Sequence, residues 1–194
     1  MGCSQFGGAV PSLPIDAGPS SGSGELILSS PDNAGESASV PFDTALYAVA
    51  DRTVDVLLLR GPVEAPQRVL HVRLVWRPRP GYTPLGARST NATVRYAVFR
   101  GEEAGVYEGS GFLLPLVEPG SDTFEGEMRE LLLKLADRTE GFDGEALPLE
   151  ARGRFDARRD DVALWSALHR IRILLRIRLG YPSLVSSSTG LSRG

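Results

Sequence analysis

The chain has 194 residues, of which 42% are hydrophobic and 23% charged, and its formal net charge is −3. This size and composition are typical of one globular domain with tails, and no apolar run approaches the roughly 18 residues that a membrane-spanning helix needs. The net negative charge argues against a nucleic-acid partner, which binds clustered and uncompensated positive charge.

Residues 1–24 are expected to form a disordered tether. They contain Pro11, Pro14 and Pro19, followed by a Gly/Ser-rich run over 20–24. Such segments bury too little apolar area to offset the entropy that ordering removes. Cys3 lies near the start of the tether and is the single cysteine of the chain, so it has no partner for a disulfide. It is instead a candidate site of lipidation.

The start Gly2-Cys3-Ser4 and the polar tether resemble the mature N-terminus of bacterial lipoproteins. In that family a small residue precedes the cysteine, the thiol carries diacylglycerol, and a polar linker leads to the folded domain. The resemblance covers residues 1–24 and lacks the charged and apolar segments that precede the cysteine in a precursor. It implies a lipid anchor on Cys3 and a place on the periplasmic side of the bacterial cell envelope.

Two alternatives for Cys3 stay open. Met-Gly-Cys is also similar to the eukaryotic dual-acylation start, with myristate on Gly2 and palmitate on Cys3, but that pattern has Ser or Thr where this chain has Phe6. Otherwise Cys3 is a free thiol on a tail, and the domain is cytoplasmic.

Beyond the tether, period-two alternation predicts strands. A short strand is expected at 26–28, then a polar loop over 29–39, and further strands at 44–50, 53–60, 68–77 and 94–100. In the segment 68–77, Leu70, Val72 and Leu74 share one face, whereas His71 and Arg73 share the other. Along 94–100, the outward residues are expected to be Arg95 and Arg100. Glycine and proline between these segments supply turns.

Two longer segments, 123–136 and 145–158, are predicted to form a hairpin joined by residues 137–144. On the first arm, Phe124 and Met128 alternate inward, but Leu131 and Leu133 fall on the opposite face. A β-bulge near Glu130 accounts for this change of phase. A helix over 127–137 is the competing interpretation, because leucine, glutamate and lysine favour helices.

A helix is predicted over about residues 160–179. Asp160 and Asp161 suit its N-terminus, and Gly180 followed by Pro182 suits its end. One apolar stripe runs along it: Leu164, Leu168, Ile171, Leu175 and Leu179. The fold is therefore expected to be all-β or β-rich α+β, an antiparallel β-sandwich with one C-terminal amphipathic helix. The sandwich domain would span 25–182, followed by a flexible tail over 183–194.

The charges of the second half fall into bands of opposite sign. Residues 101–150 carry 13 acidic and three basic side chains, and residues 151–194 carry nine arginines and three aspartates. We expect the helix arginines to pair with the acidic band at 118–150. The alternative is that these arginines, with Val162, Ile173 and Ile177 near them, meet anionic lipid headgroups or an acidic partner.

Few residues suggest chemistry. With two histidines and one cysteine, a metal site is not expected, and His71 and His169 are interpreted as solvated surface side chains. The acidic residues Asp137, Glu140, Asp143 and Glu145 fail the spacing of an EF-hand loop, so a solvated hairpin loop is expected there and a calcium site is the alternative. No nucleophile motif or glycine-rich phosphate loop occurs.

Glu125 and Glu127 have the spacing of an exposed strand face, and Arg152 and Arg154 on the other hairpin arm are their expected partners. The sequence thus predicts a non-enzymatic domain, without cofactor, with a binding, structural or assembly role in the envelope. Its expected contacts are the membrane, through a lipid on Cys3, and a protein partner; no small-molecule substrate is identified. A soluble cytoplasmic β-domain and a hydrolase that uses carboxylates are the alternatives.

Overall fold

The computed structural model describes residues 22–30, 37–51, 53–74, 90–144 and 148–180. Within these ranges, eight strands are followed by one helix. The elements are β1 (Gly22–Ser29), β2 (Ser37–Ala50), β3 (Thr53–Arg60), β4 (Arg68–Leu74), β5 (Ala92–Arg100), β6 (Glu103–Pro115), β7 (Thr123–Arg138), β8 (Leu149–Arg159) and α1 (Asp161–Leu179).

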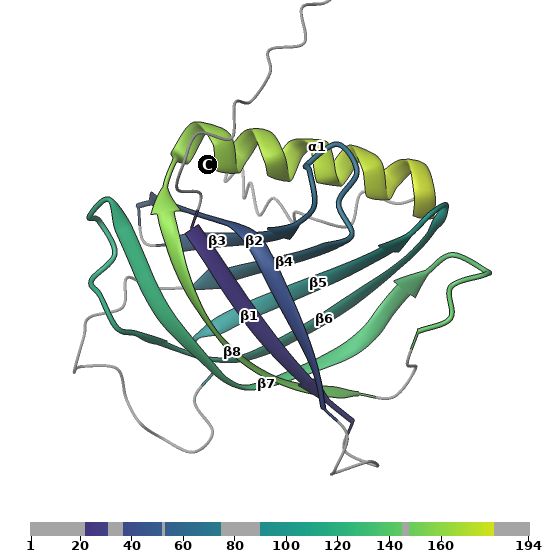
Figure 1. Cartoon of the computed structure of the whole chain (residues 1–194), viewed down its shortest axis with the longest axis horizontal. Coiled ribbons are helices and arrows are strands. Elements are labelled where there is room, and N and C mark those ends of the chain that lie inside the picture. Colours follow the sequence, from purple (N-terminus) through teal and green to yellow (C-terminus); the bar gives the residue numbers. More distant parts are fainter. Residues whose placement is uncertain (1–21, 31–36, 52, 75–89, 145–147, 181–194) are drawn as a thin grey trace, which may run out of the picture.

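The eight strands form a closed antiparallel barrel, with α1 lying across its outside (Figure 1). Each strand pairs with the next along the chain, and β1 also pairs with β8, which closes the sheet. The predicted β-sandwich is therefore wrong, whereas the β-rich class and the C-terminal helix are confirmed. A sandwich and a barrel share the same alternation along each strand. They differ here in the pairing of the first strand with the last, which no local pattern encodes.

Glycine permits the close approach of β1 and β8. A Cβ atom on Gly153 of β8 would lie 2.2 Å from the carbonyl oxygen of Glu25 on β1. At the start of the same pair of strands, a Cβ on Gly22 would lie 1.9 Å from the carbonyl oxygen of Asp156. Neither contact is sterically allowed, so side chains at these two positions would force the seam apart.

Apolar side chains form two separate layers, one inside the barrel and one between its outer wall and α1. The first is built from the inward residues of every strand. The second covers the outer faces of β2 to β6 with the buried stripe of α1: Ala48, Leu57, Leu59, Val69, Ala97, Phe99, Ala104, Val106, Leu164, Ala167, Leu168, Ile171 and Leu175. Strand β3 contributes to both layers, which explains its nearly continuous apolar run.

Aromatic side chains fill one end of the barrel. The ring of Phe124 lies 5.4 Å from that of Tyr47 and 5.4 Å from that of Phe155. The Tyr47 hydroxyl donates a hydrogen bond to the carbonyl of Ser121 and accepts one from the Gly120 N–H. This end, where β6 connects to β7 and β8 leads into α1, is closed by packed side chains.

The hairpin of β7 and β8 and its bulge are confirmed. The register between the strands shifts between Met128 and Leu131, and Glu130 has a positive φ of 51°. The extra residue of the bulge shifts the alternation of β7 by one position, so Met128 and Leu131 are both on the inner side of the barrel and buried. The competing helix over 127–137 is absent because both arms pair as strands.

Strands β1 and β2 begin earlier in the chain than the sequence predicted. Strand β1 begins at Gly22 and β2 at Ser37, so both include polar residues that were expected to lie in the tether or a loop. Backbone pairing with neighbouring strands requires no apolar side chain on the outer face, and the pattern of alternation therefore misses these ends.

The predicted helix ends are confirmed. The Asp160 carboxylate accepts a hydrogen bond from the Ala163 N–H, and Gly180 adopts a left-handed conformation at the C-terminus.

We predict that the Glu130 bulge tolerates glycine but rejects a β-branched residue. Glu130→Gly should leave the free energy of unfolding unchanged or raise it by up to about 1 kcal/mol, whereas Glu130→Val should lower it by about 1 kcal/mol or more, because only glycine adopts positive φ without strain. Urea unfolding followed by circular dichroism measures both changes. The matched control, Glu125→Gly in a regular part of β7, should be destabilising; equal effects at the two positions would contradict the bulge.

Candidate functional site: a pocket at the barrel mouth

The end of the barrel opposite the aromatic cluster contains a pocket of about 430 Å³, here called the mouth pocket. It lies where β1, β5 and β7 end, at the right-hand side of Figure 1. Its lining comes from strands on all sides of the barrel and from the connection between β7 and β8: Leu28, Ser29, Ser30, Ser37, Ala38, Val40, Arg68, Tyr96, Val98, Arg100, Tyr107, Phe142, Asp143, Gly144 and Leu149.

The wall of the mouth pocket combines apolar and cationic groups. Val40, Val98 and Leu149 belong to the inner apolar layer and continue it up to the mouth. Within the described lining, Arg68 and Arg100 contribute two guanidinium groups, whereas Asp143 is the one acidic residue. The polar side chains at the mouth are therefore dominated by positive charge and hydrogen-bond donors.

Arg68 stands at the first position of β4, in register with Val98. One of its terminal nitrogens donates to the Gln67 carbonyl oxygen at 3.0 Å, but its Nε is buried and has no hydrogen-bond partner in the described part of the chain. A buried donor that lacks an acceptor costs free energy, so an acceptor supplied by a ligand would be favoured there.

Arg68 also acts on Tyr96, one strand away. Burial, the larger effect, raises the pKa of the Tyr96 phenol above 10.0, and the charge and a hydrogen bond from Arg68 lower it in part. The phenol therefore stays protonated at neutral pH. The Tyr96 ring lies 6.0 Å from that of Tyr107, so the two phenols line the pocket side by side.

Phe142 forms the part of the wall that the connection between β7 and β8 provides. Its ring is buried and belongs to the inner apolar layer, although Phe142 follows the end of β7. The ring lies against the backbone of β6, where a Cβ on Gly105 would come within 2.2 Å of it. A glycine at position 105 is therefore what allows Phe142 to enter the barrel.

Arg100 holds this connection in place. Its guanidinium donates a hydrogen bond to the Asp143 carbonyl at 2.9 Å and lies 5.9 Å from the centre of the Phe142 ring. The prediction that Arg100 faces outward with Arg95 is wrong. It lies an even number of residues from Tyr96 and Val98 and lines the pocket with them, whereas Arg95 pairs with Glu108 on the outer wall at 3.0 Å.

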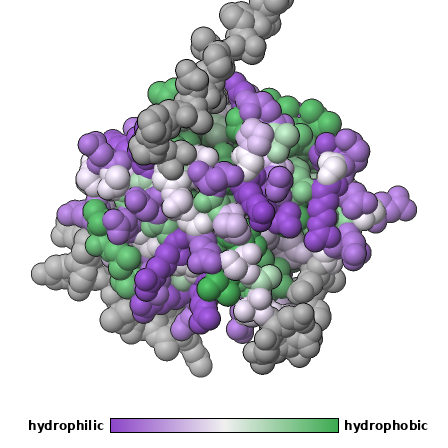
Figure 2. Space-filling model, viewed as in Figure 1, coloured by the Kyte–Doolittle hydropathy of each residue, from purple (hydrophilic) through white to green (hydrophobic). Residues whose placement is uncertain are grey.

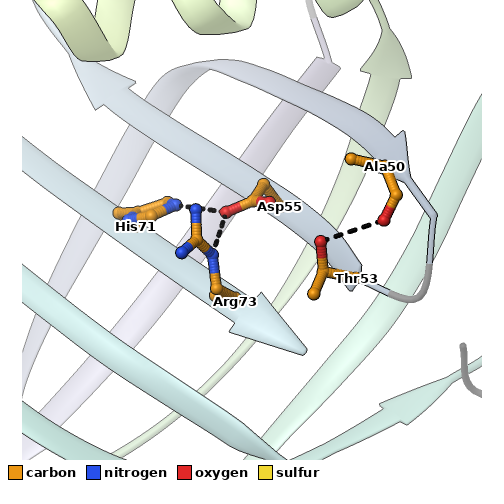
Figure 3. A network of polar contacts seen from close by, with 5 residues as sticks. All are labelled: Ala50, Thr53, Asp55, His71 and Arg73. Atoms are coloured by element: carbon orange, nitrogen blue, oxygen red, sulfur yellow. Dashed lines mark hydrogen bonds and ion pairs between the residues drawn. The ribbon is translucent and has the colours of Figure 1, made fainter. Parts of the chain in front are cut away.

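A second polar cluster lies on the outer wall (Figure 3). The same Asp55 carboxylate oxygen is 2.8 Å from His71 Nε2 and 2.7 Å from Arg73 Nε. Asp55 and His71 are buried, so the interpretation of His71 as a solvated side chain is wrong. The alternation correctly placed it on the outer face but did not show that this face is covered.

Asp55 is charged in this cluster. Its burial raises the pKa of the carboxyl, but hydrogen bonds and positive charge from His71 and Arg73 together outweigh that effect and hold the pKa below 3.8. Its other oxygen has no hydrogen-bond partner. The cluster joins an acid and an imidazole in the arrangement of a buried ion pair, and among the described residues no serine, threonine or cysteine is hydrogen-bonded to the ring.

The remaining candidates from the sequence that the structure describes lie apart from the mouth pocket. Cys3 and Glu145 fall outside the described residues, and His169 is exposed on α1. Glu127 lies opposite Arg154 as predicted, 3.7 Å away, and also pairs with Arg129 at 2.9 Å. The predicted arginine partner of Glu125 is wrong, because the register places Asp156 opposite it.

Glu127 is stabilised in its charged form. A hydrogen bond from Arg129 is the main cause that lowers the pKa of its carboxyl; desolvation acts in the other direction, and the charges of Arg129 and Arg154 add to the decrease. In the described ranges, no group of three or more histidine, cysteine, aspartate or glutamate side chains is placed to hold a metal ion.

The mouth pocket was not evident from the sequence because its residues come from six separated segments. The available signal was local: Arg68 and Arg100 stand at strand ends and Tyr96 in the middle of β5, all at inward positions where a polar side chain is unusual for a filled core.

Comparison with family models, curated proteins and solved structures finds no match to this chain. No helix among the described residues is long and apolar enough to cross a membrane.

We predict that the Asp55 cluster makes stability depend on pH. Because the folded-state pKa of Asp55 lies below 3.8, its charged form stabilises the fold above that pH, and the contribution is lost as the pH falls through the folded value. The free energy of unfolding, measured by urea titration from about pH 6 to pH 3, should therefore decrease more steeply for the wild type than for Asp55→Asn.

At neutral pH, Asp55→Asn should itself cost about 3 kcal/mol, because it breaks a buried ion pair. Asp156→Asn, a change at an exposed residue of β8, is the control and should retain the wild-type pH dependence. Parallel pH profiles for wild type and Asp55→Asn would show that the cluster contributes nothing to the dependence.

Proposed function

We propose that this chain is a non-catalytic binding domain tethered to the bacterial cell envelope, and that the mouth pocket is its binding site. The ligand class that fits is a small organic anion with an apolar body. The single observation that carries this proposal is the buried Nε of Arg68, which lines the mouth pocket and has no hydrogen-bond partner among the described residues.

The dimensions and chemistry of the pocket support a small ligand. Its volume of about 430 Å³ falls in the range of sites for drug-sized molecules, roughly 300–1,000 Å³. The inner apolar residues would contact the body of the ligand, and Arg68 with the neutral phenol of Tyr96 would donate hydrogen bonds to its anionic group. A rigid barrel holds these groups in place before binding, which limits the entropy lost.

The position at which β1 begins is compatible with a tether. Strand β1 begins at Gly22 beside the closed end and reaches the mouth at Ser29, a span of about 23 Å along the strand. The tether from a lipid-bearing Cys3 would therefore join the barrel at the end away from the mouth pocket. An anchored domain of this design keeps the site accessible to a ligand.

The hydrolase alternative lacks a comparable observation. A carboxyl general acid requires a raised pKa, whereas Asp55 and Glu127 both have lowered pKa values. Among the described residues that line the mouth pocket, Asp143 has no second carboxylate beside it. Binding without catalysis is the simpler function for these residues.

We predict that the mouth pocket binds anilinonaphthalene sulfonate, an apolar anion whose fluorescence rises in apolar surroundings. Binding should saturate at one molecule per chain. Arg68→Met, which keeps most of the side-chain volume but removes the charged donor, should weaken the Kd about tenfold or more. Fluorescence titration measures both values.

Arg154→Met is the matched control, because Arg154 is 74% exposed on the outer wall. It should leave the Kd unchanged, and circular dichroism should show that all three proteins are folded. Unsaturable binding, or equal affinity for Arg68→Met and wild type, would sink the assignment of the mouth pocket.

We predict that Cys3 carries diacylglycerol in the native host. Expression from the natural upstream DNA, followed by mass spectrometry of the membrane fraction, should reveal an N-terminal peptide that begins at the lipidated Cys3. Cys3→Ser should move the protein to the soluble fraction. An unmodified Cys3 in soluble protein would contradict the tether but would leave the binding site untouched.

A further inference from the structure

Helix α1 has a second apolar stripe, on the side that faces solvent. Of the six large apolar side chains that are well exposed in the described part of the chain, four lie on α1. They are Val162 (82% exposed), Trp165 (39%), Ile173 (45%) and Ile177 (74%). At 100° per residue these four side chains fall within an arc of about 120°, opposite the stripe that packs on the barrel. We call this surface the outer α1 face.

Arginines border the outer α1 face. Arg170 and Arg172 lie at its two edges, and Arg176 lies within it. Among these, Arg170 forms an ion pair with Glu64 at 2.7 Å, while no ion pair of Arg172 or Arg176 occurs within the described ranges. The Nε of Arg172 also lacks a hydrogen-bond partner.

The pairing of the helix arginines differs from the expected one. Arg170 forms an ion pair with Glu64, near the turn between β3 and β4, and Arg178 forms one with Glu102, near the turn between β5 and β6. The acidic band at 118–150 is thus not their partner, and the positive charge of Arg172 and Arg176 is left beside the exposed apolar residues.

We propose that the outer α1 face docks on an anionic lipid surface. Valine, isoleucine and tryptophan would enter the boundary between headgroups and acyl chains, and the bordering arginines would contact lipid phosphates. Figure 2 shows hydrophobic (green) residues reaching the surface beside hydrophilic (purple) ones along the upper edge, where α1 lies.

The path of the chain supports a lipid surface as the occupant. Ser23 lies opposite Asp156 near the end of β8, which leads directly into α1. The segment from Cys3 to Gly22 therefore joins the barrel close to the N-terminal end of the helix. If this segment forms the tether that the sequence predicts, a chain of that length reaches about 25 Å, enough to bring α1 to a membrane that holds Cys3.

Docking in this orientation leaves the proposed ligand site free. Helix α1 runs along the side of the barrel (Figure 1), whereas the residues that line the mouth pocket lie at the end of the barrel where β1 and β5 end. The choice of a lipid surface as the occupant rests in part on the proposed tether, but the contacts themselves involve α1 alone, so the docking of α1 can be tested without the lipid on Cys3 and without the proposed ligand.

The test uses the full chain with Cys3→Ser, so that no acyl chain contributes. Co-sedimentation with vesicles of phosphatidylglycerol and phosphatidylcholine in equal parts should show binding that phosphatidylcholine alone does not support and that salt weakens. The double change Ile173→Asp with Ile177→Asp should lower the partition coefficient at least about tenfold. Arg176→Gln should lower it about fivefold.

Leu132→Asp is the matched control, because Leu132 is 45% exposed on β7 away from α1. It should bind vesicles as the parent does. In a Trp76→Phe background, the emission of Trp165 should shift to shorter wavelength on binding.

Two results would overturn the proposal. One is the absence of phosphatidylglycerol-dependent binding, or an equal loss in the Leu132→Asp control. The other is that the parent chain does not bind vesicles but forms a concentration-dependent dimer in sedimentation velocity, and that the two isoleucine changes abolish this dimer. The outer α1 face would then be an interface between two copies of the chain.

Discussion

The pairing of β1 with β8 is the constraint on which the rest of the molecule depends. Without it, β1 and β8 would each have an unpaired edge, and the inner apolar layer would open to water. The seam is sterically demanding, since Gly22 and Gly153 stand where a Cβ would overlap the backbone of the opposite strand. Closure also determines where the chain enters and leaves the barrel. The N-terminal segment and α1 both join at the closed end, so the opposite end is left to the strand connections and the mouth pocket.

The two sides of the barrel wall have different roles. Inside, aromatic side chains fill the closed end, and the mouth is left with Arg68, Tyr96 and Tyr107 around an open volume. Outside, α1 covers β2 to β6 and leaves a basic, apolar face toward solvent. A ligand site at one end and a docking surface along one side can act at the same time. This division follows from the closed sheet, because each strand presents alternate residues to the two sides.

The sequence predicted the elements better than their arrangement. The Glu130 bulge followed from a change of phase among leucines, and the ends of α1 followed from Asp160 and Gly180, because these signals are local. Barrel closure, the burial of His71 and the gathering of Arg68 with Tyr107 depend on contacts between distant segments. Alternation predicts which face of a strand a residue occupies but not whether that face is covered. His71 was therefore predicted to be solvated, although it is buried. The membrane anchor on Cys3 concerns residues outside the described ranges and stays a prediction.

The most direct test of the mouth pocket is amide chemical-shift mapping of the ¹⁵N-labelled chain during titration with anilinonaphthalene sulfonate. A ligand held at the mouth predicts that the largest shifts occur at Ser29, Val98 and Gly144, while Gly120 and Ser121 at the closed end stay unchanged. Shifts centred on the closed end or spread evenly over the outer wall would contradict the account of this domain as a barrel that binds its ligand at the mouth.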